Sequence, residues 1–180
     1  DFSIEKQTLW ISWVSYNNNW KYGWSYNFTT NQNLLNLGTI NQKTWLTFSA
    51  RIKINWTTNQ TIIYKEWSYW LIIKDWSIKV TTDWWRWYDT NTQTTTTLTN
   101  WEWNHLIWTY DGNTMTIYIN WEETRTKKIT WYYPTNGNST IIGRSINHWQ
   151  LKWSIDELQV QKKFITKDIA KDLYNIHFRK

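Results

Sequence analysis

The stretch LTFSARIKI, residues 46–54, alternates apolar and polar side chains along its whole length. Leu46, Phe48, Ala50, Ile52 and Ile54 share one parity, and the residues between them share the other. Successive side chains of a strand point to opposite faces of its sheet, so this pattern predicts a strand with one buried face. A strand of this kind is typical of a β-sandwich.

Strand-like segments continue along most of the chain beyond residue 54, and turn residues separate most of them. Many short strands with such spacing indicate a sandwich or a barrel. Only the C-terminal end predicts a helix, with Thr166 as its N-cap and Ile169, Leu173 and Ile176 on one face. The further predicted strands are 61–65, 69–74, 77–82, 94–99, 105–110, 114–120, 122–129, 140–142 and 152–162.

The composition fits one domain, since 180 residues can bury a sizeable core. There is no cysteine, which excludes disulfides and thiolate metal sites. No run of 18 apolar residues occurs, so we expect no membrane span. The net charge of +6 would favour polyanions, but the basic residues are scattered, and we expect a solvated surface and no nucleic-acid partner. The first residue is Asp1, so we expect any signal peptide to lie outside this segment.

Tryptophan is unusually common here, and glycine is rare. The chain has 19 Trp and 5 Gly, whereas average usage would give about 13 Gly in this length. Two Trp stand where hairpins are predicted, in Asp75-Trp76 between 71–74 and 77–80 and in Asn120-Trp121 between 115–119 and 122–126. Two-residue hairpin turns favour Asn-Gly or Asp-Gly, because both central residues take a positive φ that suits a bulky aromatic residue poorly.

Three explanations of the Trp content compete. The residues could form a dense aromatic surface that stacks on sugar rings, or they could fill a Trp-rich core. Alternatively, the gene encodes glycine at many of these positions, because some bacterial lineages read the UGA codon as Gly. We favour this third explanation as a hypothesis, since glycine is the residue that the predicted turn positions favour.

Three segments carry a resemblance to a known family. Segment 102–121, EWNHLIWTYDGNTMTIYINW, resembles the central motif of LamG-like jelly rolls, with Trp108 and Trp121 at two of its glycines. Segment 151–160 resembles the family's G-x-I-D-E signature with Trp153 at the glycine, and segment 19–28 resembles its N-terminal element with Trp20 at the first glycine. The chain is thus similar to LamG-like domains of the concanavalin A-like lectin/glucanase superfamily over nearly its whole length.

The resemblance implies an all-β fold, a two-sheet antiparallel jelly-roll sandwich with one short C-terminal helix, as a single domain over residues 1–180. It implies a non-catalytic, extracellular or cell-surface module that binds a glycan or polysaccharide. The alternative is a structural or adhesion domain that binds a protein partner. We expect no enzyme, because the acidic pairs Asp156-Glu157 and Glu122-Glu123 are adjacent and should face opposite ways, and the E-x-D-x-x-E pattern of glucanase relatives is absent.

Two loops are candidates for binding a glycan. Segment 83–89 mixes aromatic stacking faces with groups that can hydrogen-bond hydroxyls, and it becomes a plain flexible loop if its Trp residues are glycine. A second loop carries an amide and an imidazole. The candidate ligand-binding residues are Trp84, Trp85, Arg86, Trp87, Tyr88 and Asp89 in the first loop, and Asn147 and His148 in the second.

Asp156 is the candidate metal ligand. It shares strand parity with Leu158 and Val160, so we expect its carboxylate to point to the apolar side. A carboxylate buried there needs a partner. Backbone N–H groups of the N-terminal segment would make Asp156 a structural clasp, and Ca²⁺ would make it a metal site. Domains similar to this one often bind calcium, so Ca²⁺ is the candidate cofactor.

Overall fold

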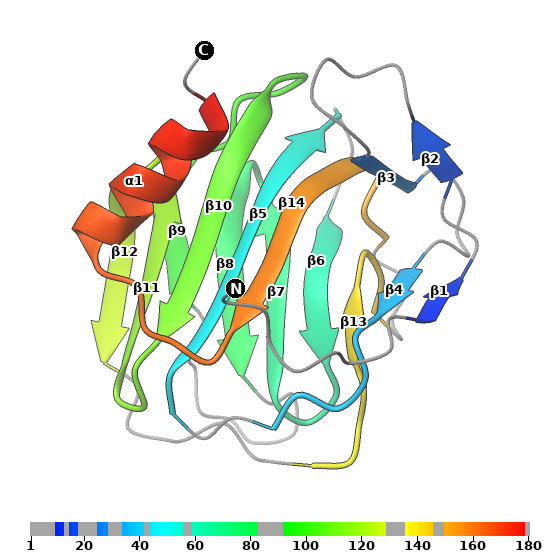
Figure 1. The fold of residues 1–180 in the computed structure, drawn as a ribbon, viewed down its shortest axis with the longest axis horizontal. Coiled ribbons are helices and arrows are strands. Elements are labelled where there is room, and N and C mark those ends of the chain that lie inside the picture. Colours follow the sequence, from blue (N-terminus) through cyan, green and yellow to red (C-terminus); the bar gives the residue numbers. More distant parts are fainter. Residues whose placement is uncertain are drawn as a thin grey trace.

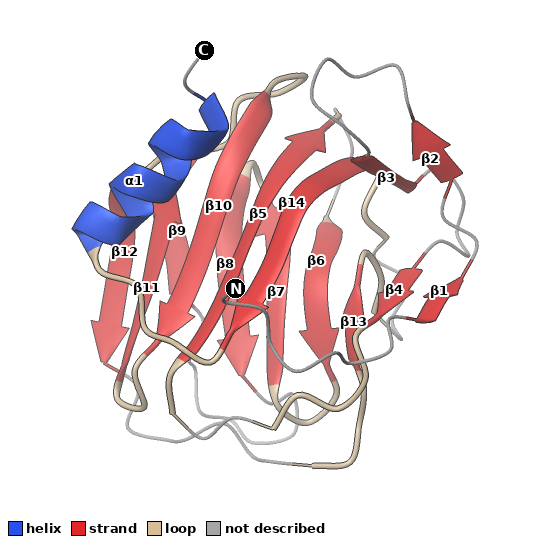
Figure 2. Cartoon of the chain, viewed as in Figure 1, coloured by secondary structure: helices blue, strands red, loops and turns tan. Residues whose placement is uncertain are grey.

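The computed structural model describes residues 10–12, 15–17, 25–28, 34–41, 44–55, 59–82, 92–128, 136–145 and 150–178. Strands make up nearly all of the regular structure in this part, and one helix follows them (Figure 2). The elements are β1 (Trp10–Ser12), β2 (Ser15–Asn17), β3 (Ser25–Phe28), β4 (Leu34–Asn36), β5 (Leu46–Ile54), β6 (Gln60–Lys65), β7 (Tyr69–Lys74), β8 (Ser77–Thr82), β9 (Thr92–Thr97), β10 (Trp103–Tyr110), β11 (Thr114–Ile119), β12 (Glu122–Lys128), β13 (Thr140–Ile142), β14 (Trp153–Gln161) and α1 (Lys167–Phe178).

The strands form two seven-stranded antiparallel sheets that face each other (Figure 1). One sheet has the order β1-β4-β13-β6-β7-β8-β9, and the other has the order β12-β11-β10-β5-β14-β3-β2. We call them the first and the second sheet. Strands β5 and β14 lie side by side although about a hundred residues separate them in the chain. The architecture is the all-β jelly-roll sandwich with a short C-terminal helix that the sequence predicts.

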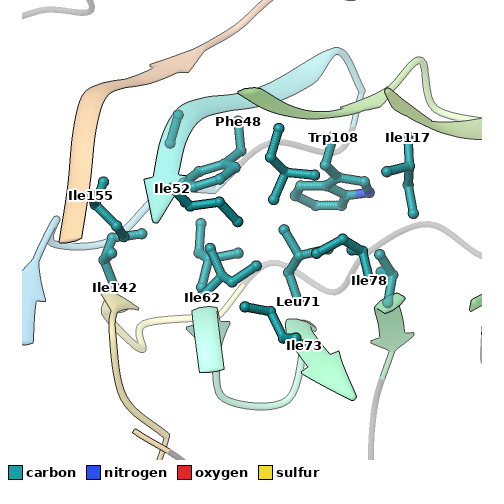
Figure 3. Packing of buried hydrophobic residues seen from close by; sticks show 14 of the residues in the cluster. Phe48, Ile52, Ile62, Leu71, Ile73, Ile78, Trp108, Ile117, Ile142 and Ile155 are labelled. Carbon is teal, nitrogen blue, oxygen red and sulfur yellow. The ribbon is translucent and has the colours of Figure 1, made fainter. Parts of the chain in front are cut away.

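The apolar core lies between the sheets (Figure 3). From the second sheet, β5 contributes Phe48, Ala50 and Ile52, all 0 % exposed, as the alternation of residues 46–54 predicts. Ile62 and Leu71 face them from the first sheet. Burying a side chain of this size stabilises the fold by about 1.5–3 kcal/mol, so this layer holds the two sheets together.

The other face of β5 is also buried, which corrects the prediction of a half-exposed strand. Thr47 is 0 % exposed, Ser49 3 % and Arg51 7 %. Part of the cover is the segment that leads into the helix, because the Thr47 hydroxyl donates a hydrogen bond to the Lys163 carbonyl. Alternation shows which residues of a strand share a face. It does not show whether a segment that is distant in the chain covers that face.

Helix α1 lies across the outer face of the second sheet over β10, β11 and β12 (Figure 1). It begins directly after Thr166, the predicted N-cap, whose carbonyl accepts the first helical hydrogen bond from the Ala170 N–H. Ile169 and Leu173 pack on an apolar patch around Ile107, as predicted. Ile176 does not: it is 71 % exposed, because the apolar cluster under the helix ends at Leu173.

Both predicted two-residue hairpins form. Lys74 pairs with Ser77, and Ile119 pairs with Glu122. The turn residues have φ values of 49° and 66° at Asp75-Trp76, and of 51° and 69° at Asn120-Trp121. Both central residues of each turn are therefore left-handed, as the tight hairpin requires. A residue with a side chain in this region costs about 1–2 kcal/mol, and glycine avoids that cost.

Candidate functional site

A cluster of polar and aromatic side chains lies on the outer face of the second sheet, beside the helix. It consists of Ser49 and Arg51 on β5, Trp103 and His105 on β10, and Tyr174 on α1, and we call it the Arg51 cluster. The register of β5 and β10 brings these strands together, since His105 pairs directly with Arg51. Residues opposite each other in an antiparallel pair share a face, so both side chains leave the core.

The contacts inside the Arg51 cluster are specific. The Ser49 Oγ and the His105 Nε2 lie 3.1 Å apart, within hydrogen-bond distance. The Arg51 guanidinium carbon is 5.2 Å from the centroid of the Trp103 ring, which is cation–π geometry. The His105 ring lies 6.2 Å from the Tyr174 ring at an interplanar angle of 34°. His105 is only 1 % exposed, so the deep part of this cluster joins the sheet to the helix.

Asp156 lies on this outer face, next to Arg51 in the register of β14 and β5. The prediction that it points to the apolar side is wrong. The register shifts between Asp156 and Gln159, and Glu157 has a φ of 51°, so the alternation is interrupted. Ile155 and Leu158 both contact the core, and Asp156 falls between them on the other side. Because of this irregularity, the alternation of faces does not continue from Asp156 to Leu158, as the prediction required.

The carboxylate of Asp156 accepts a hydrogen bond of 2.8 Å from the Glu157 N–H, the next residue of its own strand. Ca²⁺ takes six to eight oxygen ligands as a rule, several of them from carboxylates. Among the residues that the structure describes, no group of three or more His, Cys, Asp or Glu side chains lies close enough to hold a metal ion. Calcium binding at Asp156 stays a prediction.

The two predicted glycan loops lie outside the described residues: Trp84, Trp85, Arg86, Trp87, Tyr88 and Asp89 in one, Asn147 and His148 in the other. Their flanking residues are described, and they lie at opposite ends of the first sheet. Thr82 pairs with Tyr69, which pairs with Lys65 at the arrowhead end of β6 (Figure 1). Lys152, after the second loop, donates its N–H to the Gln60 side chain at the other end of β6. The described residues next to the two segments therefore lie at two different ends of the sandwich.

Lys65 is a functional candidate that the sequence reasoning missed. Its side chain is 1 % exposed, and its ammonium Nζ lies 2.7 Å from the Ile40 carbonyl, 2.7 Å from the Asn41 Oδ1 and 3.5 Å from the Asn136 carbonyl. Burial lowers the pKa of Lys65 to about 8, since desolvation disfavours the charged amine. A lysine at the end of the apolar run TIIYK gives no sign in the sequence that it is buried.

The segments around this ammonium are joined to one another as well. The Asn136 side chain donates to the Glu66 carbonyl at 2.7 Å, and the Asn136 N–H donates to the Asn41 Oδ1 at 3.2 Å. The Asn138 side chain also reaches the Glu66 carbonyl, at 3.4 Å. We call this network of Asn41, Lys65, Glu66, Asn136 and Asn138 the Lys65 rim. It fixes the loops at the end of the first sheet from which segment 83–91 also departs.

The fold is similar to those of solved carbohydrate-binding and related domains. Domain 4 of the GH43 extracellular arabinanase AbnA of Geobacillus stearothermophilus, solved in complex with arabinotriose, matches 91 % of this chain and 82 % of its own, with a TM-score of 0.72 and 16 % identity. A SAP-like pentraxin of Limulus polyphemus matches 83 % of this chain and 81 % of its own, with a TM-score of 0.66 and 16 % identity. The chain is thus a jelly-roll sandwich of the kind that also builds these domains.

A third similar structure is the binding domain of botulinum neurotoxin DC in complex with SialylT. It matches 93 % of this chain with a TM-score of 0.70 and 13 % identity, and this chain spans 46 % of its length. No protein-family model matches the sequence, and no curated protein matches it, so the LamG-like resemblance stays a prediction. In the part of the chain that the structure describes, no helix is long and apolar enough to cross a membrane.

Proposed function

We propose that this protein is a non-catalytic carbohydrate-binding module of an extracellular or cell-surface protein. The observation that carries the proposal is the likeness of the fold, over 91 % of the chain, to an arabinanase domain whose structure contains arabinotriose. The toxin binding domain, which has the same fold and was solved in complex with SialylT, also supports the proposal of a glycan ligand. A jelly roll hosts many functions, so the proposal also depends on where this chain could hold a sugar.

The end of the sandwich that carries the Lys65 rim is the proposed binding surface. Segment 83–91, with the predicted residues Trp84 to Asp89, follows Thr82 at the end of β8. Strand β8 is two strands away from β6, so the backbone of Thr82 lies about 10 Å from that of Lys65 at the usual strand spacing. The hydrogen bonds of the rim hold the adjacent loops in one arrangement. Fixed loops lower the entropy that is lost when a ligand binds, which favours recognition of flexible oligosaccharides.

The experiment is a binding screen on a panel that contains arabino-oligosaccharides and sialylated glycans. We expect selective binding that weakens about tenfold or more in Arg86→Ala and Asp89→Asn, because each removes a group suited to charged hydrogen bonds with hydroxyls. Lys162→Ala is the matched control for Arg86→Ala, since Lys162 is exposed and lies on the second sheet's side, after β14. A loss confined to Asn147→Ala and His148→Ala would move the site to the other end of the sandwich.

Two further arms of this screen test the remaining parts of the proposal. Calcium assistance at Asp156 predicts that a chelator weakens binding and that Asp156→Asn weakens it equally. The non-catalytic role predicts that the oligosaccharides stay intact after long incubation, measured as the absence of new reducing ends. Failure to bind any glycan, with and without Ca²⁺, would contradict the proposal and favour the structural or adhesion role with a protein partner.

A further inference from the structure

Most of the non-glycine residues that have a left-handed backbone in the described part of the chain are tryptophan. Eight non-glycine residues in the described part have a positive φ, and five of them are Trp: Trp45 (59°), Trp67 (60°), Trp76 (66°), Trp101 (64°) and Trp121 (69°). The other three are Asp75, Asn120 and Glu157. The described part contains ten Trp, so half of them are left-handed; the remaining five are Trp10, Trp70, Trp103, Trp108 and Trp153.

Chemistry does not favour Trp at such positions. Only a few per cent of non-glycine residues have a positive φ, and Asn and Asp supply a disproportionate share because their short side chains tolerate the conformation. A bulky side chain at Cβ clashes with the following carbonyl in this region, while glycine has no Cβ and takes it freely. Gly38, Gly112 and Gly143 occupy comparable positions in this same chain. The five Trp therefore stand where the backbone favours glycine.

Three of the five indoles are about half exposed or more. Trp45 is 59 % exposed, Trp67 49 % and Trp101 47 %, although a large aromatic side chain is normally well buried. Trp76 packs partly against the core, and the Trp121 ring lies 5.3 Å from the Lys171 Nζ. A cation–π contact at an exposed site is weak, and partial packing at a turn does not remove the backbone strain.

We infer that the polypeptide made in its own cells carries glycine at positions 45, 67, 76, 101 and 121. The UGA codon is read there as Gly, and a standard reading writes Trp in its place. Trp103 is the tryptophan for comparison, because its φ is not left-handed and the Arg51 guanidinium carbon lies 5.2 Å from the centroid of its ring. Glycine then rises from 5 to at least 10 residues, closer to the roughly 13 of an average chain of this length.

The inference holds whether or not the protein binds glycans, but it changes how a ligand surface is identified. Each of the exposed indoles of Trp45, Trp67 and Trp101 offers a face that could stack on a sugar ring. With glycine at these positions, those aromatic faces do not exist in the native protein. Ligand recognition must then come from the polar groups and from aromatic residues at ordinary backbone positions.

The gene and the native protein test the inference directly. We expect UGA at all five codons and UGG at the codon of Trp103. Fragment mass spectra of peptides from the native source should give glycine at the five positions and tryptophan at 103. A UGG codon, or a spectrum with an indole, at any of the five positions would overturn the assignment there, and the same result at most of them would overturn the inference as a whole.

Recombinant protein gives a second test that depends only on the backbone. Each Trp→Gly substitution at the five positions should raise Tm, by about 2–4 °C, because it relieves the left-handed strain. Trp→Ala at the same position is the matched control, since it removes the indole but keeps the Cβ, and it should not give this gain. Trp103→Gly should lower Tm. Gly variants that are no more stable than their Ala partners would contradict the inference.

Discussion

The two faces of β5 are both buried, but they are built from different chemistry. The inner face presents Phe48, Ala50 and Ile52 to the facing sheet, where apolar side chains interlock in one continuous cluster. The outer face presents Thr47, Ser49 and Arg51, and each of these meets a particular polar or aromatic partner. The stability of the inner face depends on the volume and apolar area that its side chains bury, whereas that of the outer face depends on pairs of polar groups.

This difference separates what holds the sheets together from what attaches the rest of the chain. Apolar packing is non-directional and sets the overall fold. Directional pairs fix where the segment before the helix and the helix itself lie on the second sheet, because a hydrogen bond requires a defined geometry. Changes on the inner face should therefore unfold the whole domain, and changes on the outer face should release local segments at a smaller cost.

The largest expected effect is on the inner face. Phe48→Ala removes a side chain that is 0 % exposed between the sheets, and should lower the free energy of unfolding by about 3–5 kcal/mol, because a cavity remains where the ring was. Urea unfolding measures the loss. The control is Ser49→Ala, the next residue on the outer face, whose hydrogen bond with His105 should be worth only about 0.5–1.5 kcal/mol. Equal losses in the two variants would remove the distinction between the faces.

The next effect is on the outer face, at Thr109. The Ile165 N–H donates to the Thr109 hydroxyl at 3.1 Å, and that hydroxyl lies 2.7 Å from the hydroxyl of Thr47, which in turn contacts the Lys163 carbonyl. Thr109→Val keeps the shape but leaves buried polar partners without a bond. We expect a loss of about 1–3 kcal/mol in urea unfolding, with faster hydrogen exchange at the Ile165 amide.

An exposed threonine supplies the control for this substitution. Thr126 is on β12 and also hydrogen-bonds another threonine, Thr116, at 3.1 Å, but its side chain is exposed. Thr126→Val should change the free energy of unfolding by about 0.5 kcal/mol or less. If Thr109→Val leaves the exchange of Ile165 unchanged, the buried chain of hydroxyls does not fix the segment that leads into the helix.

The sequence predicts the inner face well and the outer face poorly, for a physical reason. Strict alternation over residues 46–54 identifies Phe48 and Ile52 as core residues, and the strand bounds agree with the structure at β5, β7, β8 and β13. Strand β9 begins two residues earlier than predicted, because a run of threonines carries no alternation to mark its start. Strands β1 to β4 are three or four residues long, too short for a periodic pattern.

The candidate site was harder to predict, because it depends on contacts between distant residues. Asp156 was placed on the wrong face, since the interruption at Glu157 is a backbone feature without a marker in the sequence. Lys65 was missed because its partners, Ile40, Asn41 and Asn136, lie far from it in the chain. The positive φ of Trp76 and Trp121, in contrast, was predicted, because a two-residue hairpin imposes it locally.

A smaller effect concerns the attachment of the helix. Ile107 is 0 % exposed beneath α1, so Ile107→Val should lower the free energy of unfolding by about 0.5–1.5 kcal/mol. Ile176→Val makes the same change on the same helix–sheet layer, but at a side chain that is 71 % exposed, and its effect should be close to zero. Thermal unfolding of both variants checks the pair. A larger loss from Ile176→Val would mean that the helix packs through a different face.

The last effect, and the one most specific to this chain, is the pH dependence of Lys65. Its pKa is lowered from 10.5 to about 8 in the folded protein. Between these values the unfolded chain binds more protons than the folded one, so the free energy of unfolding should rise as the pH increases from about 8 toward 10.5. Tyr64 and Tyr118, whose pKa values burial raises to about 12, oppose this rise above pH 10, because they ionise more readily when unfolded.

Comparison with Lys65→Met isolates the contribution of this amine, since the tyrosines are the same in both proteins. From pH 8 to pH 10, the free energy of unfolding of the wild type should rise relative to that of the variant. If the two free energies change in parallel with pH, the lowered pKa of Lys65 is contradicted. A carbon-13 titration of the Lys65 Cε in the wild type is independent of whether the variant folds. A midpoint near 8 would show that desolvation outweighs the three oxygens around the ammonium. A midpoint near 10.5 would show that those hydrogen bonds keep the buried amine charged, and would contradict the lowered pKa.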